Sequence, residues 1–164
     1  MSEFYKILIV DDDASVLMAI QHVLKREGYD VHTAGDGILA LEIAREIPPD
    51  LILCDYLMPQ MNGVEVFQAM TEICPVAVRI LVTGHADLEV AMSAINEDGV
   101  YKFVLKLWNT KDLGVLVRRA LEHQLIQEGK ALMEMLDMAL RQQEVKSRGL
   151  QDQVDRYRRM LAMD

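Results

Sequence analysis

The order of apolar and amphipathic segments is the feature that most constrains the fold of this chain. Over the first 110 residues, short apolar runs alternate with stretches whose apolar residues recur at helical spacing. The runs are residues 5–10, 30–34, 51–54, 79–83 and 102–106, and the helical stretches are residues 14–27, 38–46, 64–72 and 88–97. This alternation is typical of βα units, which build a parallel sheet covered by helices.

The composition of individual runs indicates where each strand lies in the sheet. Residues 7–10 and 51–54 are apolar on both alternating faces, as expected for central strands with helices on each side. Residues 29–33 alternate between apolar and polar side chains, which suits a more exposed strand. The sequence therefore predicts a three-layer α/β sandwich.

The segment after Thr110 keeps a helical pattern through Met163, beyond the end of one covering helix. Such a helix would extend about 80 Å, which exceeds the width of a domain of this size. Apolar residues spaced alternately by three and four suggest a coiled-coil seam, with Leu132, Leu136, Ala139, Leu150, Tyr157 and Met160 in it and Gln143, Lys146 and Gln153 interrupting it. We expect residues 123–164 to be a helical extension that dimerises. The alternatives are a helix-turn-helix piece packed on its own domain and the start of an output domain.

Charge and hydropathy exclude several classes of partner. The formal net charge of −9 disfavours duplex DNA or an anionic membrane as the main partner, because both attract basic surfaces. No apolar run approaches the ~20 residues that cross a bilayer, and the first residues do not resemble a signal peptide. We therefore expect a cytoplasmic protein, with Cys54 and Cys74 as buried thiols.

Polar residues follow the predicted strands at one end of each. The first strand ends in Asp11, Asp12 and Asp13, the third in Asp55. The fourth ends in Thr83 and the fifth in Lys106. Each residue alone has an ordinary explanation, such as an N-cap role for Asp13. Together they are expected to meet, because the carboxyl ends of parallel strands lie at the same edge of the sheet.

This combination of residues suits phosphoryl transfer. Asp11, Asp12 and Asp55 would repel one another and raise at least one pKa unless a cation lay among them. Mg²⁺ prefers a few carboxylates together with carbonyls, waters and phosphate oxygens. Asp55 offers a carboxylate nucleophile, while Lys106 and Thr83 offer donors for the negative charge that develops on a phosphoryl group.

Four segments resemble the receiver domain of two-component response regulators: residues 7–13, 54–63, 82–85 and 103–106. The likeness covers residues 4–122. It implies a flavodoxin-like fold with a five-stranded parallel sheet in the order 2-1-3-4-5.

The resemblance also implies a role for each site residue. Asp55 would accept a phosphoryl group from a phosphohistidine on a sensor kinase or a phosphotransfer protein. Asp12 would bind Mg²⁺ directly, Asp11 largely through water, and Leu57 through its backbone carbonyl. Lys106 would contact the phosphoryl group.

Two further residues match the family's switch positions. Thr83 corresponds to the hydroxyl that moves toward the phosphoryl oxygens, and Phe103 to the aromatic residue whose rotamer follows that movement. The resemblance thus implies a phosphoacceptor switch that catalyses only its own phosphorylation and dephosphorylation. Its two states would differ on the face formed by the fourth helix, fifth strand and fifth helix.

The residue after Lys106 departs from the family pattern. Leu107 stands where the family usually has proline, often after a cis bond. A cis peptide before a residue other than proline costs ~2.5–4 kcal/mol, so a trans bond or a strained loop is expected. Either would shift the Lys106 ammonium and weaken signalling.

Two other functions are compatible with parts of the sequence. A phosphatase resembling the haloacid dehalogenases would use Asp11 as nucleophile and Asp13 as acid or base, but it would lack a second acidic pair and a role for Asp55. A receiver that only dimerises, independently of phosphorylation, has Leu107 as its support. Direct nucleic-acid binding is not expected, since the arginines near the C-terminus are offset by acids. The sequence does not indicate which effector or output domain the switch controls.

Overall fold

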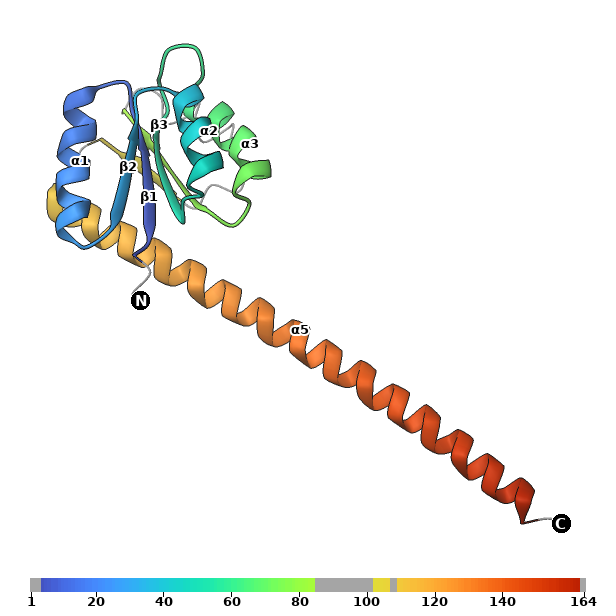
Figure 1. Cartoon of the computed structure of the whole chain (residues 1–164). Coiled ribbons are helices and arrows are strands. Elements are labelled where there is room, and N and C mark those ends of the chain that lie inside the picture. The colour runs from blue at the N-terminus through green and yellow to red at the C-terminus, as the bar shows by residue number, and fades with distance from the viewer. Residues whose placement is uncertain (1–3, 85–101, 107–108, 163–164) are drawn as a thin grey trace. The chain divides into compact units, whose positions relative to one another are not determined.

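The computed structural model describes residues 4–84, 102–106 and 109–162. Five parallel strands form one sheet in the order β2-β1-β3-β4-β5 (Figure 1). The strands are β1 (Lys6–Val10), β2 (Asp30–Ala34), β3 (Leu51–Asp55), β4 (Val78–Thr83) and β5 (Lys102–Leu105). The predicted flavodoxin-like α/β fold and its strand order are confirmed, and no strand end differs from the prediction by more than about one residue.

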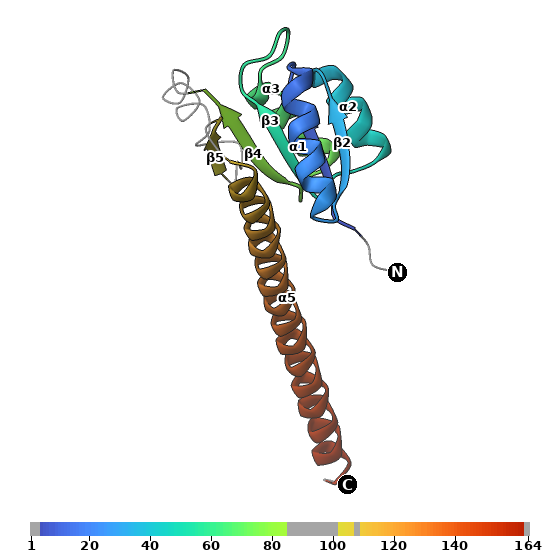
Figure 2. The same ribbon diagram turned by 90° about the vertical axis from the view of Figure 1, so that its left-hand side faces the viewer.

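Four helices accompany the described strands: α1 (Ala14–Arg26), α2 (Gly37–Glu46), α3 (Gly63–Ile73) and α5 (Thr110–Leu161). Figures 1 and 2 show α2 and α3 on one side of the sheet and α1 on the other. The helix predicted over residues 88–97 lies outside the described residues.

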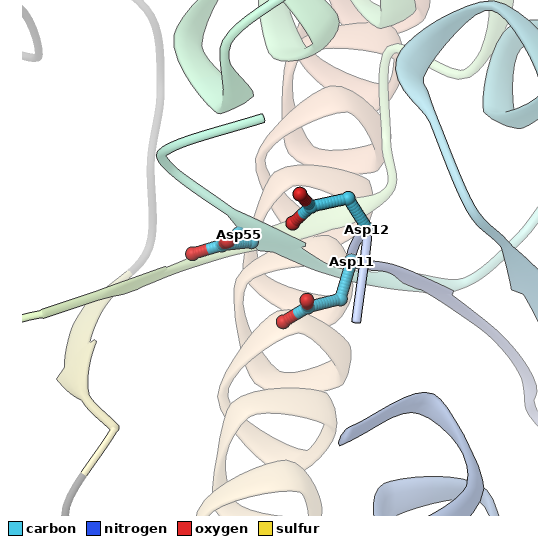
Figure 3. Close-up of side chains that lie close together, drawn as sticks. All are labelled: Asp11, Asp12 and Asp55. Atoms are coloured by element: carbon cyan, nitrogen blue, oxygen red, sulfur yellow. The ribbon is translucent and has the colours of Figure 1, made fainter. Parts of the chain in front are cut away.

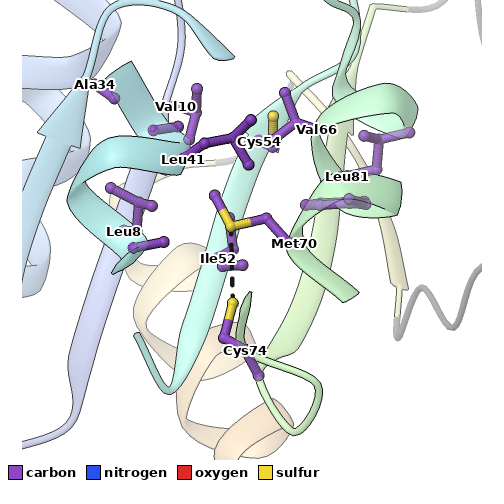
Figure 4. Close-up of a cluster of buried hydrophobic side chains, with 14 of the residues drawn as sticks. Leu8, Val10, Ala34, Leu41, Ile52, Cys54, Val66, Met70, Cys74 and Leu81 are labelled. Atoms are coloured by element: carbon purple, nitrogen blue, oxygen red, sulfur yellow. Dashed lines mark hydrogen bonds between the residues drawn. The ribbon is translucent and has the colours of Figure 1, made fainter. Parts of the chain in front are cut away.

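Two apolar clusters fill the space between the sheet and its helices. The cluster under α2 and α3 joins β1 and β3 to helix side chains such as Met70 (Figure 4). Met70 and Phe67, also in this cluster, are both fully buried. The other joins the opposite face of the sheet to α1 and to the first turns of α5, where Leu113 and Val117 are buried. Both faces of β1 and β3 are covered, as their apolar sequences predicted.

Side-chain caps fix where the helices begin. Asp13 accepts hydrogen bonds from the backbone N–H groups of Ser15 and Val16 at the start of α1. Asn62 and Glu65 form a capping box at the start of α3. These caps set the length of the loops that follow β1 and β3.

The chain divides into two compact units, one up to Glu122 and one from His123 on. Helix α5 runs through Gly129 and Gly149 without a break, so the helix-turn-helix alternative is wrong. The strong helix formers around each glycine outweigh its cost of about 1 kcal/mol. Among the described residues, no helix combines the length and apolarity that crossing a membrane requires.

Candidate functional site

The strand register places the predicted site residues at one edge of the sheet. Val10 pairs with Cys54, so Asp11 and Asp55 follow at the same level of neighbouring strands. On the next strand along, Asp55 pairs with Val82, the residue before Thr83. Thr83 pairs in turn with Leu105, the residue before Lys106.

Three carboxylates gather at this edge. One oxygen from each of Asp11, Asp12 and Asp55 lies within 4.8 Å of the others. Figure 3 shows Asp11 and Asp12 next to the end of β1 and Asp55 beside them on β3. Oxygens this close are a donor set that suits a hard divalent cation.

Lys106 connects two of these carboxylates. Its Nζ lies 3.0 Å from Oδ2 of Asp55 and 3.1 Å from Oδ2 of Asp11. The other oxygen of Asp11, Oδ1, accepts a hydrogen bond of 2.9 Å from the backbone N–H of Asp13. One ammonium among three carboxylates leaves an excess of negative charge at the site.

Burial makes this excess charge costly. Asp11 is 2% exposed and Asp55 4% exposed, whereas Asp12 lies at the surface. Burial raises the pKa of Asp55 above its usual value, the charges of Asp11 and Asp12 act in the same direction, and Lys106 opposes them. Burial also lowers the pKa of Lys106, but its hydrogen bonds to Asp55 and Asp11 outweigh that effect and leave the pKa raised.

Thr83 ends β4 with a fully buried side chain. Its Oγ1 donates a hydrogen bond of 3.1 Å to the backbone carbonyl of Gly84. The hydroxyl is therefore already engaged within its own loop, and it would exchange that partner in order to reach another acceptor.

The remaining predicted residues have different places. The side chain of Leu57, in the loop after β3, is 58% exposed. Phe103 lies in β5, but its side chain is outside the described part of the chain, as are Leu107 and its peptide bond. Asp13 caps α1 and does not belong to the carboxylate cluster.

Gly63, the last residue of the segment 54–63, also shapes the site. A Cβ atom at this position would lie 2.5 Å from the backbone oxygen of Asp55 and 2.6 Å from Cδ1 of Leu81. The backbone N–H of Gly63 also donates to the carbonyl of Tyr56 at 3.0 Å. Glycine thus lets α3 start directly against the strand that carries Asp55. The sequence signal that could have indicated this close approach was a glycine at the first residue of a helix.

The family model for the response regulator receiver domain matches residues 7–118. The chain belongs to this family. Regulatory protein AtoC of Escherichia coli is 32% identical over 124 residues, covering 76% of this chain and 27% of AtoC. DNA-binding response regulator MtrA of Mycolicibacterium paratuberculosis is 35% identical over 116 residues, covering 71% of this chain and 51% of MtrA.

A solved structure gives the same result for the fold. The signal receiver domain of an HD domain-containing protein from Pseudomonas fluorescens matches with a TM-score of 0.69 and 34% identity, covering 74% of this chain and 98% of that one. The chain spans about a quarter to a half of the curated relatives it matches. Because the name of MtrA includes DNA binding, the expectation of no nucleic-acid partner is not supported by the relatives.

Proposed function

We propose that this receiver is the phosphoacceptor of a two-component phosphorelay and that Asp55 is the residue phosphorylated. The observation that carries the proposal is the contact of the buried Asp55 carboxylate with Lys106 Nζ at 3.0 Å, within 4.8 Å of the Asp11 and Asp12 oxygens. A nucleophile, a donor and a candidate metal site thus surround one position, which is what phosphoryl transfer requires.

In the proposed reaction, an oxygen of Asp55 attacks the phosphorus of a phosphohistidine on a sensor kinase or a phosphotransfer protein. The new O–P bond forms as the N–P bond breaks, and the imidazole nitrogen leaves with the bonding electron pair. Lys106 donates to a phosphoryl oxygen and balances its charge. The protein is a switch and not an enzyme acting on other substrates.

Mg²⁺ is the cofactor that these residues fit. Asp12 and Asp55 would hold it directly, Asp11 largely through water, and the backbone carbonyl of Leu57 would complete the protein's share. When bound, the ion supplies positive charge for the phosphoryl oxygens. The three clustered carboxylates support this assignment because Lys106 offsets only one of their charges.

The phosphorylated state would be sensed by Thr83 and Phe103. The Thr83 hydroxyl would leave the carbonyl of Gly84 for a phosphoryl oxygen, and Phe103 would follow on the neighbouring strand. The changed surface would act through α5 on a second copy of the chain or on an output domain. We include a homodimer through residues 123–164 in this proposal, with a cytoplasmic location.

Incubation with a small acyl phosphate and Mg²⁺, followed by intact-mass measurement, tests the proposal. We expect the wild type to gain the mass of one phosphoryl group and Asp55→Asn to gain none. Asp152→Asn, which removes an exposed carboxylate from α5, is the matched control and should be phosphorylated like the wild type.

Two results would contradict the assignment. If the wild type and Asp55→Asn both gained no phosphate, the scaffold alternative would be favoured. If Asp55→Asn were labelled and Asp11→Asn were not, a dehalogenase-like chemistry on Asp11 would replace it. The position of Asp13 argues against dehalogenase-like chemistry, because its carboxylate accepts a hydrogen bond from the backbone N–H of Ser15 at the start of α1.

A further inference from the structure

The part of α5 beyond Glu122 carries an apolar stripe along one face of the helix. Large apolar side chains recur at the first and fourth positions of a seven-residue repeat, which we call the core positions a and d. Position a holds Ile126, Met133, Leu140, Val154 and Leu161, and position d holds Leu136, Leu150 and Tyr157. All of these side chains are exposed, from 43% at Val154 to 79% at Leu161.

This stripe follows a different register from the seam that begins at Leu132. That seam shares Leu136, Gln143, Leu150 and Tyr157 with the stripe but also places Lys146 and Gln153 inside it. The a/d register moves both polar residues to the edge. It spans about five heptads, with large apolar residues at all a and d positions except Gly129, Gln143 and Ser147.

We infer that a second copy of this chain covers the stripe, in a parallel, two-stranded coiled coil with the two helices in register. The inference rests on the homodimer of the proposed function and specifies its register and direction. β-branched residues at a with leucine at d favour two strands over three or four. Two of the six a positions, Ile126 and Val154, are β-branched, and two of the five d positions, Leu136 and Leu150, are leucine.

Charges beside the stripe select the parallel direction. The positions that follow d include Lys130, Glu144 and Arg158. In a fully overlapping antiparallel pair these positions face one another, so Lys130 meets Arg158 and Glu144 meets its own equivalent. Both contacts join like charges, which are repulsive.

The parallel arrangement avoids these contacts. There, each position after d faces the position before a on the other helix. Those partners are mostly uncharged and include Leu125, Leu132, Ala139 and Gln153; the one lysine among them, Lys146, faces Gln151. No like charges meet.

Two polar residues within the stripe fix the register. Gln143 stands at d and Ser147 at the next a position. With the helices in register, the two Gln143 side chains face each other and can exchange hydrogen bonds. A shift by one heptad would bury each amide against Leu136 or Leu150 without a partner, and an unpaired buried amide is unfavourable. Single polar core residues set register in coiled coils in this way.

Disulfide trapping in the full chain tests the direction and the register. Leu136→Cys and Tyr157→Cys should each form a covalent dimer under mild oxidation. The matched controls Met138→Cys and Arg159→Cys lie on the outer face of the same turns and should form little. The native Cys54 and Cys74 are buried, so the parent chain should stay uncrosslinked.

The outcomes separate the arrangements. Self-crosslinking at both 136 and 157 is possible only for parallel helices in register, because an antiparallel pair brings a residue to its own copy only near the centre of the overlap. Crosslinking of a mixture of Leu136→Cys with Val154→Cys, without either crosslinking to itself, would show an antiparallel pair and overturn the inference. So would a monomer by light scattering at all concentrations tested.

A second pair of variants distinguishes the two seams. Val154→Lys changes an a position, and Gln153→Lys changes its neighbour at the edge. We expect Val154→Lys to weaken dimerisation at least about tenfold and Gln153→Lys to have an effect within about twofold. If Gln153→Lys weakened dimerisation more than Val154→Lys, the seam that begins at Leu132 would form the contact and this register would be wrong. Phosphate incorporation at Asp55, measured on the same samples, should be unchanged, so loss of the dimer alone leaves the phosphoacceptor proposal standing.

Discussion

The carboxylate cluster and the C-terminal helix break the usual rule of burial in opposite ways. At the sheet edge, Asp11 and Asp55 are almost fully buried. Along the helix, the leucines and methionines of the stripe are more than half exposed, including Met133 and Leu150, each at 64%. Buried charge and a long exposed apolar face are both informative departures from the norm.

Both departures are unfavourable in free energy, and the two regions differ in what would stabilise them. Buried carboxylates gain from a cation, which pairs with their charge. An exposed apolar stripe gains from removal of its surface from water, which another stripe of the same kind provides. One region therefore indicates a small ionic ligand and the other a second protein chain.

Methionines placed in the two units give the largest expected contrast. Met70, on α3, is fully buried, and Met138 is exposed on the outer face of α5. Met70→Ala should lower the free energy of unfolding by about 2–5 kcal/mol, because it leaves a cavity in a packed core. Met138→Ala should change it by less than about 0.5 kcal/mol. Urea titration followed by circular dichroism measures both, and equal losses would show that Met138 is covered.

Glycines provide the next contrast. Gly63→Ala would force a Cβ against the Asp55 carbonyl, so we expect a loss of about 1–3 kcal/mol in unfolding free energy and slower phosphorylation. A Cβ atom at Gly149 would meet no atom within 4 Å, and Gly149→Ala should stabilise the helix by about 0.5–1 kcal/mol. Thermal unfolding and phosphorylation rates distinguish the two. If Gly63→Ala left the free energy of unfolding unchanged, α3 would be able to move away from the Asp55 carbonyl with little loss of stability.

Asp55→Asn tests whether the buried charge is costly. Because the pKa of Asp55 is raised in the folded protein, its contribution favours folding below the ordinary carboxyl pKa and is lost as the pH rises through the raised value. At pH 7 without Mg²⁺, the amide should therefore stabilise the protein, by about 1 kcal/mol on the scale of single substitutions.

Acid and Mg²⁺ provide the controls for that variant. Below the ordinary carboxyl pKa the advantage of the amide should vanish, because both side chains are then neutral. Addition of Mg²⁺ should stabilise the wild type more than the variant, which lacks one ligand oxygen. A variant that was less stable than the wild type at pH 7 without Mg²⁺ would show that the Lys106 contact outweighs the burial cost.

The sequence predicted the strands and the gathering of Asp11, Asp55, Thr83 and Lys106 because both follow from local pattern and from the common direction of parallel strands. It did not predict the close approach at Gly63, which depends on how α3 meets β3 in three dimensions. Nor did it predict that the Thr83 hydroxyl bonds to Gly84, since rotamers depend on packing. Conversely, the a/d register is present in the sequence, but it becomes distinct only with a helix that runs unbroken to Leu161.

The smallest expected contrast is between an exposed ion pair on α5 and the contacts of Lys106 with the buried carboxylates. Arg141 and Asp137 lie 3.7 Å apart, one helical turn from each other, with both side chains mostly exposed. Asp137→Asn should cost at most about 0.5 kcal/mol, and salt should remove that difference, because water and ions screen an exposed pair. The contacts of Lys106 with its two buried partners should be less sensitive to salt. Urea titrations of Asp137→Asn and Lys106→Met at low and high salt compare them; equal salt sensitivity would mean that water reaches the carboxylate cluster as freely as it reaches the helix surface.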